Sequence, residues 1–170
     1  MGYKLAGYEV IGNIEIDQRV MKVYQRNNHP KHSYLMDVRD FSKIPKNEIP
    51  KELFELDILD GSPPCSVFSE AGGRERGWGK EKKFREGQKE QRLDDLFFWF
   101  IDIAKLLRPK VVVAENVKGL IKGNAKGYVN GIVKAFDDAG YKTQIFLLNA
   151  AYMGVPQKGS VYFSLRKEKT

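Results

Sequence analysis

The sequence predicts an α/β fold in which a mostly parallel sheet lies between two layers of helices. Short apolar runs rich in β-branched residues alternate with longer stretches in which apolar residues recur at helical spacing, a pattern typical of βαβ units. The chain has 170 residues, which is enough to bury one core, and no internal repeat divides it. We therefore expect a single domain spanning residues 1–170.

The first half of the chain begins with a predicted strand at residues 8–16, where β-branched and other apolar side chains predominate. Asp17 follows as the expected cap of a helix, because apolar residues recur after it at helical spacing. Residues 55–61 carry the pattern of a second short strand, which ends at Gly61. This half of the chain therefore supplies two strands and a capped helix.

The second half contains the clearest helical pattern. Residues 93–107 place large apolar side chains on one face, and Pro109 ends the pattern. A fully buried strand is expected directly afterwards at residues 111–116, which begin with consecutive valines. The remaining predicted elements are a helix and two strands, at 127–140, 143–150 and 161–166.

The segment 66–92 differs from the rest of the chain. It is dense in Gly, Lys, Arg and Glu and shows little periodicity of either kind. Long segments without regular structure inside a compact domain are usually functional lids or disordered. We expect a long mobile loop here.

Composition limits the classes of protein to consider. The net charge of +7 and the pI near 9.4 fit a polyanionic partner, and they fit a merely basic soluble protein equally well. No apolar run approaches the roughly 20 residues that cross a bilayer, and the N-terminus lacks a secretory pattern, so we expect a cytoplasmic protein without a membrane partner. One cysteine and two histidines exclude a disulfide within the chain and argue against a metal site.

Chemically active side chains follow three of the predicted strands. Glu15 ends the first strand, the turn at 61–65 ends the second, and Glu115 and Asn116 end the strand at 111–116. Ligands of open α/β sheets bind outside the carboxyl ends of the strands. We therefore expect these groups to meet at one edge of the sheet.

Cys65, the single cysteine, is the candidate nucleophile. Pro63 and Pro64 directly precede it and fix their own backbone, so the turn that presents the thiol is stiff. A thiol with a pKa of about 8.5 needs a nearby cation or a helix N-terminus to react as a thiolate at neutral pH. The alternative is an inert buried cysteine.

Glu115 is the candidate proton donor. It directly follows Val-Val-Val-Ala, where an unpaired carboxylate is costly to bury. Burial raises the pKa of a carboxyl group, which can then donate a proton near neutral pH. The structural alternative is a carboxylate that only caps a loop amide.

Several motifs together resemble the cytosine-5 DNA methyltransferase family. GSPPCSVFSEAG carries Pro-Cys followed by a Phe-Ser pair, and VVVAENVKGL carries Glu-Asn-Val at the family's separation. The likeness runs from about residue 6 to residue 166 and includes AGYEVIGNIEID, DDLFF and NAAYMGVPQK. It implies a Rossmann-like fold of the S-adenosylmethionine-dependent methyltransferases, encoded by a bacterium or a phage, and a role in DNA methylation within restriction-modification.

The resemblance also implies a reaction. In it a cytosine is flipped out of double-stranded DNA, and Cys65 attacks ring carbon 6 while Glu115 protonates or hydrogen-bonds ring nitrogen 3. Carbon 5 then takes a methyl group from S-adenosylmethionine, and elimination releases the enzyme. Asn116 would hold the cysteine loop.

The remaining site residues implied by the resemblance bind the cofactor or DNA. Glu15 would bind the ribose hydroxyls of S-adenosylmethionine, and Ile16 would pack on its adenine. The other implied cofactor residues are Asp37, Val38, Pro64 and Leu96; Ile16 and Leu96 are also plausible core residues, and Asp37 a plausible turn residue. The implied DNA-binding residues are Ser66, Arg74, Arg76, Lys80, Lys82, Lys83, Arg85 and Gln157.

Three departures from the family pattern affect what the chain is expected to do alone. The chain starts at Met1, just past the family's Phe-x-Gly-x-Gly-Gly loop, so the first, central strand is expected to be missing. Gln157 and Lys158 are not followed by the family's Arg-x-Arg, and Arg166 is no obvious substitute. No target-recognition domain follows before Thr170.

Several functions therefore remain open. The chain could be a catalytic fragment with impaired activity, a subunit of a split enzyme completed by a second polypeptide, or an inactive remnant that binds nucleic acid or protein. A tRNA cytosine methyltransferase would carry the same catalytic residues. Amino-methyltransferases use a similar Pro-Pro loop, but they place an aromatic residue where this chain has Cys65 and have no need of Glu115.

Overall fold

The computed structural model describes residues 2–64, 95–117, 126–154 and 160–168. The first part of the chain forms short elements only, apart from one longer helix. In order they are the helix α1 (Gly2–Leu5), the strand β1 (Gly12–Glu15), the helix α2 (Gln18–Asn28), the strand β2 (His32–Leu35), the helix α3 (Val38–Phe41), the 3-10 turns η1 (Lys46–Glu48) and η2 (Lys51–Phe54), and the strand β3 (Ile58–Gly61).

The second part forms the longer elements. They are the helix α4 (Leu96–Leu107), the strand β4 (Val111–Val117), the helix α5 (Lys126–Asp138), the strand β5 (Tyr141–Asn149), the 3-10 turn η6 (Ala150–Met153) and the strand β6 (Ser160–Glu168). The predicted helices and strands are confirmed in type, with shifted ends. The first predicted strand is shorter than expected, because only Gly12–Glu15 of residues 8–16 pair with a neighbour.

Local chemistry explains where the two best-defined helices begin and end. The Asp17 side chain accepts hydrogen bonds from the amides of Arg19 and Val20, which confirms the predicted cap of α2. His29 ends that helix in the left-handed conformation, with φ of 51°. Arg108 ends α4 in the same conformation, directly before the proline that cannot continue a helix.

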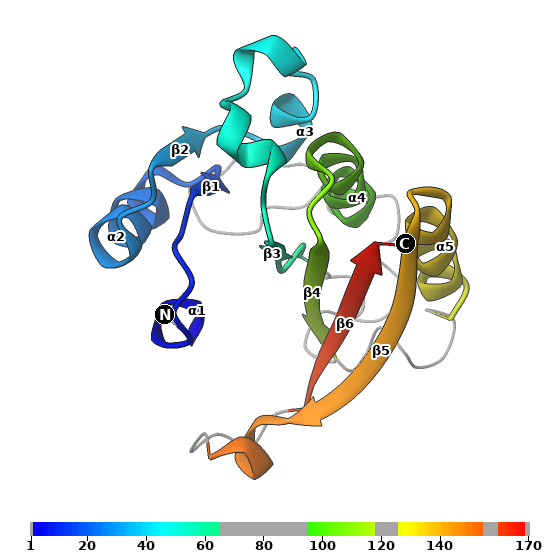
Figure 1. Ribbon diagram of the computed structural model, residues 1–170. Helices are drawn as coiled ribbons and strands as arrows, with labels where there is room; N and C mark the ends of the chain where they lie inside the picture. The colour runs from blue at the N-terminus through cyan, green and yellow to red at the C-terminus, as the bar shows by residue number, and fades with distance from the viewer. Residues whose placement is uncertain (1, 65–94, 118–125, 155–159, 169–170) are drawn as a thin grey trace.

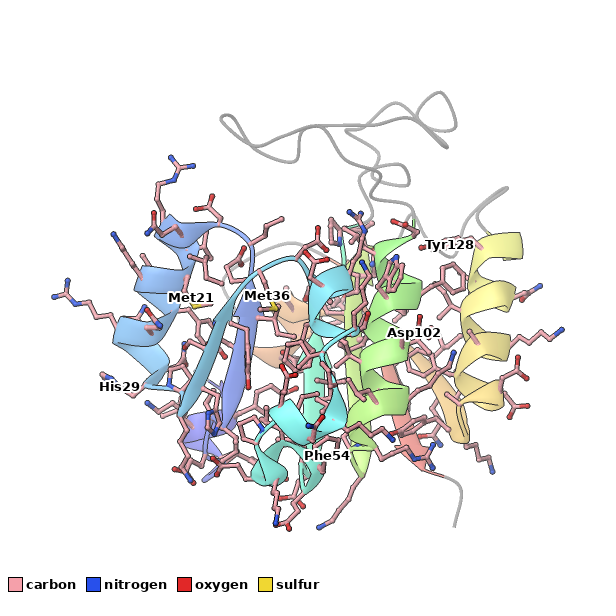
Figure 2. The ribbon with its side chains drawn as sticks, turned by 90° about the horizontal axis from the view of Figure 1, so that it is seen from above. Met21, His29, Met36, Phe54, Asp102 and Tyr128 are labelled. Carbon is pink, nitrogen blue, oxygen red and sulfur yellow. The ribbon has the colours of Figure 1, made fainter. Side chains whose placement is uncertain are left out.

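The strands form two sheets instead of one. One sheet contains β1 and β2 in parallel, and the other has the order β3-β4-β6-β5. β3 and β4 are parallel, while β6 runs antiparallel to both β4 and β5. His29, which precedes β2, and Phe54, which precedes β3, lie on the same side of the molecule (Figure 2), so β1 to β5 share one direction and only β6 is reversed. The predicted mostly parallel sheet is confirmed.

Helices cover both faces of the strands, as the sequence predicts. α3, α4 and α5 lie on one face, and α1 and α2 lie on the other (Figure 1). The helix α4 is central to its layer and buries seven side chains, among them Phe97, Phe100 and Ile101. No helix in the described part of the chain is long and apolar enough to cross a membrane.

Two apolar clusters form the core. The first joins α4 and α5 to β4 and includes Phe97, Ile101, Phe136 and Tyr141. The second joins α3, the 3-10 turns and α4, and side chains from both sheets pack against it; its members include Phe41, Leu53, Ile103 and Leu107. Because this second cluster contacts Ile14 of β1 and Leu59 of β3, side-chain packing connects the two sheets where backbone pairing does not.

Gly61 packs so closely against α4 that a side chain has no room there. A Cβ at this position would lie 2.5 Å from the ring of Phe100, which is itself buried. We expect Gly61→Ala to lower the free energy of unfolding by about 1–3 kcal/mol, because the ring or the strand must move. Urea denaturation measures this change.

Gly131→Ala is the matched control for that substitution. A Cβ at Gly131, inside α5, would meet only the ring of Phe98 at an ordinary 3.7 Å. Alanine there should raise the free energy of unfolding by about 0.5–1 kcal/mol through helix propensity. Equal effects of the two substitutions would contradict the close contact at Gly61.

Candidate functional site

The carboxyl ends of four parallel strands meet at one edge of the molecule. β1 ends at Glu15, β2 leads to Asp37, β3 leads to the Pro63-Pro64 turn, and β4 carries Glu115 and Asn116 near its end. Of these groups, the Pro-Pro turn and Asn116 are in direct contact; that Glu15 meets them stays a prediction. Cys65 lies outside the described residues, immediately after Pro64.

Asn116 joins the end of β4 to the Pro-Pro turn. Its Nδ2 donates to the carbonyl oxygen of Pro63 at 3.0 Å, and its Oδ1 accepts from the amide of Val117 at 2.8 Å. The side chain is buried, with only 4% of its surface exposed. Both the nitrogen and the oxygen of the Asn116 side-chain amide are therefore hydrogen-bonded. The last described residues before Cys65 are thus fixed to the adjacent strand.

Glu115 and Asn116 point to opposite faces of β4. Side chains alternate along a strand, and Asn116 shares its face with Val112 and Ala114, which pack in the cluster under α4. Glu115 therefore lies on the other face with Val113, and it is half-buried. A half-buried carboxyl group at the end of a strand can approach a ligand while part of its surface is already desolvated.

Glu15 lies where β1 turns into α2. Its Oε1 accepts a hydrogen bond from the amide of Asp17 at 2.9 Å, which fixes the carboxylate at the start of the helix. Among the described residues, no hydrogen bond to its other oxygen is found, so Oε2 can accept from a ligand hydroxyl. The next residue, Ile16, is 48% exposed and is not part of the core.

Asp37 belongs to a polar network that links the starts of two helices. Its Oδ1 caps α3 by accepting from the amide of Arg39 at 2.9 Å, and its Oδ2 accepts from the Arg39 guanidinium at 3.3 Å. The same guanidinium donates to Asp95, which precedes α4, at 3.3 Å. Trp99 also donates to Asp95, through Nε1 at 3.3 Å. Arg39 and Asp95 were not predicted from the sequence, because no local pattern pairs residues so far apart.

Val38 and Leu96 support this network from the apolar side. Val38 packs against the core cluster of Phe41, and Leu96 is 8% exposed at the first turn of α4. Both therefore lie where the polar edge meets the core. Pro64, the last described residue of the turn, is half-buried.

Asp60, which directly precedes Gly61, accepts a hydrogen bond from Tyr3 of α1 at 3.0 Å. Asp60 is exposed to solvent. The protein atoms around it nevertheless disfavour the charged carboxylate and raise its pKa. Burial and the Asp60 charge raise the pKa of Tyr3 as well. This contact ties α1 to the strand that leads to the Pro-Pro turn.

The expected DNA-binding residues cannot be placed in this site. Ser66, the basic residues of 66–92 and Gln157 lie outside the described residues, as does Cys65. Among the described residues, no group of three or more His, Cys, Asp or Glu side chains could hold a metal ion.

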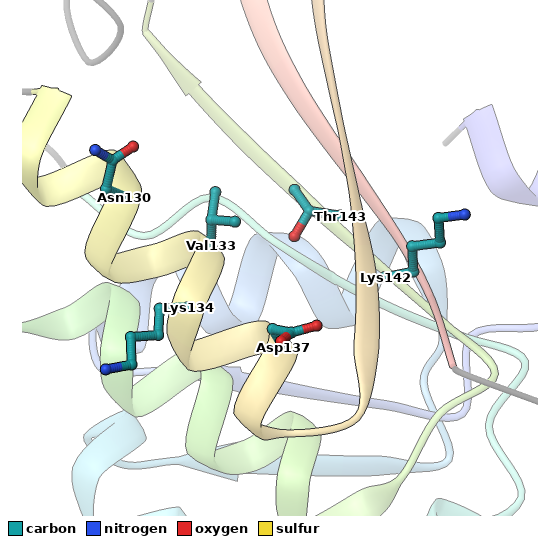
Figure 3. Close-up of a pocket in the computed structure, with 6 residues that line it drawn as sticks. All are labelled: Asn130, Val133, Lys134, Asp137, Lys142 and Thr143. Carbon is teal, nitrogen blue, oxygen red and sulfur yellow. The ribbon is translucent and has the colours of Figure 1, made fainter.

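A hollow of about 530 Å³ between α5 and β5 is a separate feature (Figure 3). It is lined by Asn130, Val133, Lys134, Asp137, Lys142 and Thr143. It opens beside the amino end of β5, away from the carboxyl ends where Glu15 and Asn116 lie. It is therefore not the candidate site.

Comparison with protein families identifies the relatives of this chain. The model of the C-5 cytosine-specific DNA methylases matches residues 1–168. The type II methyltransferase M.FnuDI of Fusobacterium nucleatum is 34% identical over 170 residues, covering 99% of this chain and 44% of the relative. The orphan methyltransferase M.Rho11sI of Bacillus phage rho11s is 35% identical over 150 residues, covering 88% of this chain and 26% of the relative. The chain thus spans less than half the length of these curated relatives.

A solved structure confirms the fold. A DNA modification methyltransferase encoded within a prophage of E. coli superposes with a TM-score of 0.69 at 22% identity, covering 98% of this chain and 42% of that one. The chain therefore has the α/β fold of S-adenosylmethionine-dependent methyltransferases, as the sequence predicts.

The double hydrogen bond of Asn116 predicts a specific loss of stability. Asn116→Ala removes a buried side chain and leaves the Pro63 carbonyl and the Val117 amide without their side-chain partner, so we expect the free energy of unfolding to fall by about 1–3 kcal/mol. Urea denaturation measures the loss. As a control, Asn149→Ala removes one exposed capping bond to Ala151 and should cost only about 0.5 kcal/mol. A loss at Asn116 no larger than the control would refute the tie between the strands.

Proposed function

The chain belongs to the C-5 cytosine-specific DNA methylase family, and we propose that it is the catalytic part of an enzyme that methylates carbon 5 of cytosine in double-stranded DNA. The observation that carries the proposal is the bond from Asn116 to Pro63, because it holds the turn before Cys65 against the strand that carries Glu115. A nucleophile and an acid that must act on one ring need such a fixed separation.

We propose S-adenosylmethionine as the methyl donor, and the residues at the edge of the sheet fit it. Glu15 offers a carboxylate oxygen to ribose hydroxyls, Ile16 offers an exposed apolar side chain to a flat base, and Asp37 offers acceptors beside them. Bound S-adenosylmethionine supplies an electrophilic methyl group. Val38, Pro64 and Leu96 would complete the wall of this pocket.

In the proposed reaction the thiolate of Cys65 forms a bond to carbon 6 of a flipped cytosine. Glu115, in its protonated form, donates to ring nitrogen 3, so the electron pair released from the carbon 5–carbon 6 double bond does not accumulate as charge on the ring. After carbon 5 has been methylated, a water molecule takes its proton, the carbon–hydrogen electron pair re-forms the carbon 5–carbon 6 double bond, and the sulfur–carbon 6 pair leaves with the Cys65 thiolate. Glu115 returns the nitrogen to its original state by taking its proton back.

The basic residues after Cys65 are proposed to contact DNA phosphates. These residues follow the nucleophile in sequence and are Arg74, Arg76, Lys80, Lys82, Lys83 and Arg85; Ser66 and Gln157 are also proposed to bind DNA. The net charge of +7 is compatible with a polyanionic partner.

Trapping on a modified base tests the catalytic proposal. With S-adenosylmethionine and a duplex containing 5-fluorocytosine, the chain should form a denaturant-resistant complex, because fluorine at carbon 5 blocks the final elimination. Cys65→Ala should abolish the complex and leave salt-dependent DNA binding unchanged. Glu115→Gln should slow its formation by about 10²–10⁴-fold, the usual contribution of a general acid. A complex that survives in Cys65→Ala would exclude this nucleophile, and DNA binding without any complex would identify an inactive remnant.

Cofactor binding is tested separately by titration calorimetry. We expect S-adenosylmethionine to bind with micromolar affinity, about −8 kcal/mol, and Glu15→Ala to weaken binding at least about tenfold through loss of a charge-assisted hydrogen bond. Glu55→Ala, an exposed glutamate before β3, is the matched control and should bind as the unmodified chain does. Equal binding by Glu15→Ala and the unmodified chain would contradict the assignment of Glu15.

A further inference from the structure

Arg39 places one cation between two carboxylates. Its guanidinium donates to Oδ2 of Asp37 and to Oδ1 of Asp95, each at 3.3 Å. Among the described residues, no other cation pairs with either carboxylate, and the neighbouring Lys43 pairs with Asp40 instead. The Arg39 side chain is only 21% exposed, so water screens these charges less than it screens a pair on the open surface. Without the guanidinium, two like charges would face each other.

Asp95 occupies the N-cap position of α4, but its side chain does not cap the helix. An aspartate in this position usually accepts hydrogen bonds from the amides of the first turn, which stabilises the helix by about 1 kcal/mol. Here the side chain makes no such bond. Its Oδ1 accepts from Arg39 and its Oδ2 accepts from the indole of Trp99. The carboxylate is therefore used for a contact between two helices and not for its own helix.

The helices α3 and α4 are also joined by apolar side chains, at a different place. Phe41, the last residue of α3, belongs to the same buried cluster as Ile103 and Leu107 of α4. Ile103 lies about 12 Å along the helix from Asp95. The apolar cluster therefore does not by itself fix the first turn of α4 against the start of α3, and the Arg39 contacts act at that end.

The residues that Arg39 joins are neighbours of the residues proposed for the cofactor pocket. Asp37 and Val38 lie at the start of α3, and Leu96 directly follows Asp95 at the start of α4. A change in the spacing of the two helix starts would therefore change the width of the proposed pocket. A site whose walls are fixed in advance loses less free energy to ordering when its ligand binds.

We propose that Arg39 is a positioning residue for cofactor binding: it neutralises Asp37 and Asp95 together and thereby fixes the start of α3 against the start of α4. The inference rests on the proposed binding of S-adenosylmethionine at this edge of the sheet. Removal of the cation leaves two carboxylates that repel each other and move the pocket walls apart. Removal of one carboxylate together with the cation relieves that repulsion.

Titration calorimetry with S-adenosylmethionine on charge variants tests this role. Arg39→Gln keeps a polar side chain but removes the charge, and we expect it to weaken binding at least about tenfold. Arg39→Gln combined with Asp95→Asn should bind within about threefold of the unmodified chain, because no like-charge pair remains. A role of Arg39 in packing alone would not be rescued by the second substitution. Arg26→Gln, which removes an exposed arginine of α2, is the matched control and should bind as the unmodified chain does.

The outcomes separate this role from the proposed cofactor itself. Urea denaturation first establishes that each variant is folded; if Arg39→Gln is not, the double variant decides alone and must both fold and bind. A double variant that binds as weakly as Arg39→Gln would overturn the role, and so would Arg39→Gln that binds as tightly as the unmodified chain. Absence of binding by the unmodified chain would instead refute the proposed cofactor, and the role of Arg39 would be lost with it.

Discussion

The parallel ladder between β3 and β4 is the constraint on which the rest of the site depends. It sets Gly61 opposite Ala114, and so it brings the Pro-Pro turn beside the end of β4. In the described part of the chain, two further contacts support the arrangement: the ring of Phe100 against Gly61, and the Asn116 amide on the Pro63 carbonyl. The helix α4 and the Asn116 side-chain amide thus hold the turn, which itself has few backbone donors because of its prolines.

The other half of the site is also positioned by a small number of contacts. Arg39 contacts Asp37 and Asp95, so one guanidinium positions the starts of α3 and α4 relative to each other. Glu15 is fixed by the amide of Asp17, whose own side chain begins α2. This polar edge therefore lies at helix starts: Asp37 caps α3, and Glu15 accepts from the amide of the residue that caps α2.

Sequence patterns predicted the elements whose signals lie within a few neighbouring residues. They missed the features that depend on contacts between residues far apart in the chain. The cap at Asp17 and the long helix before Pro109 were predictable because both signals lie within a few residues. β2 was missed because it is four residues long and carries histidine and serine, so its pattern resembles a loop. In the site, Glu15, Glu115 and Asn116 were predicted from their place at strand ends. The Arg39–Asp95 and Tyr3–Asp60 contacts could not be, because 56 and 57 residues separate the partners.

The interrupted sheet also bears on how the molecule opens. Hydrogen-bonded ladders make a sheet respond as a unit, but here the segment containing β1, α2 and β2 is held to the remainder by side chains. Among the described residues these are apolar contacts, the polar contacts of α1 and Arg39, and the ion pairs of Lys31 and His32 with Glu52. Such a boundary has no backbone ladder to break, so this segment can separate as a cooperative unit at a lower free energy than global unfolding requires. Glu15 and Asp37 lie on that segment, whereas Glu115 and Asn116 lie on the remainder. Local opening at this boundary would therefore separate Glu15 and Asp37 from Glu115 and Asn116 before either part of the site unfolded.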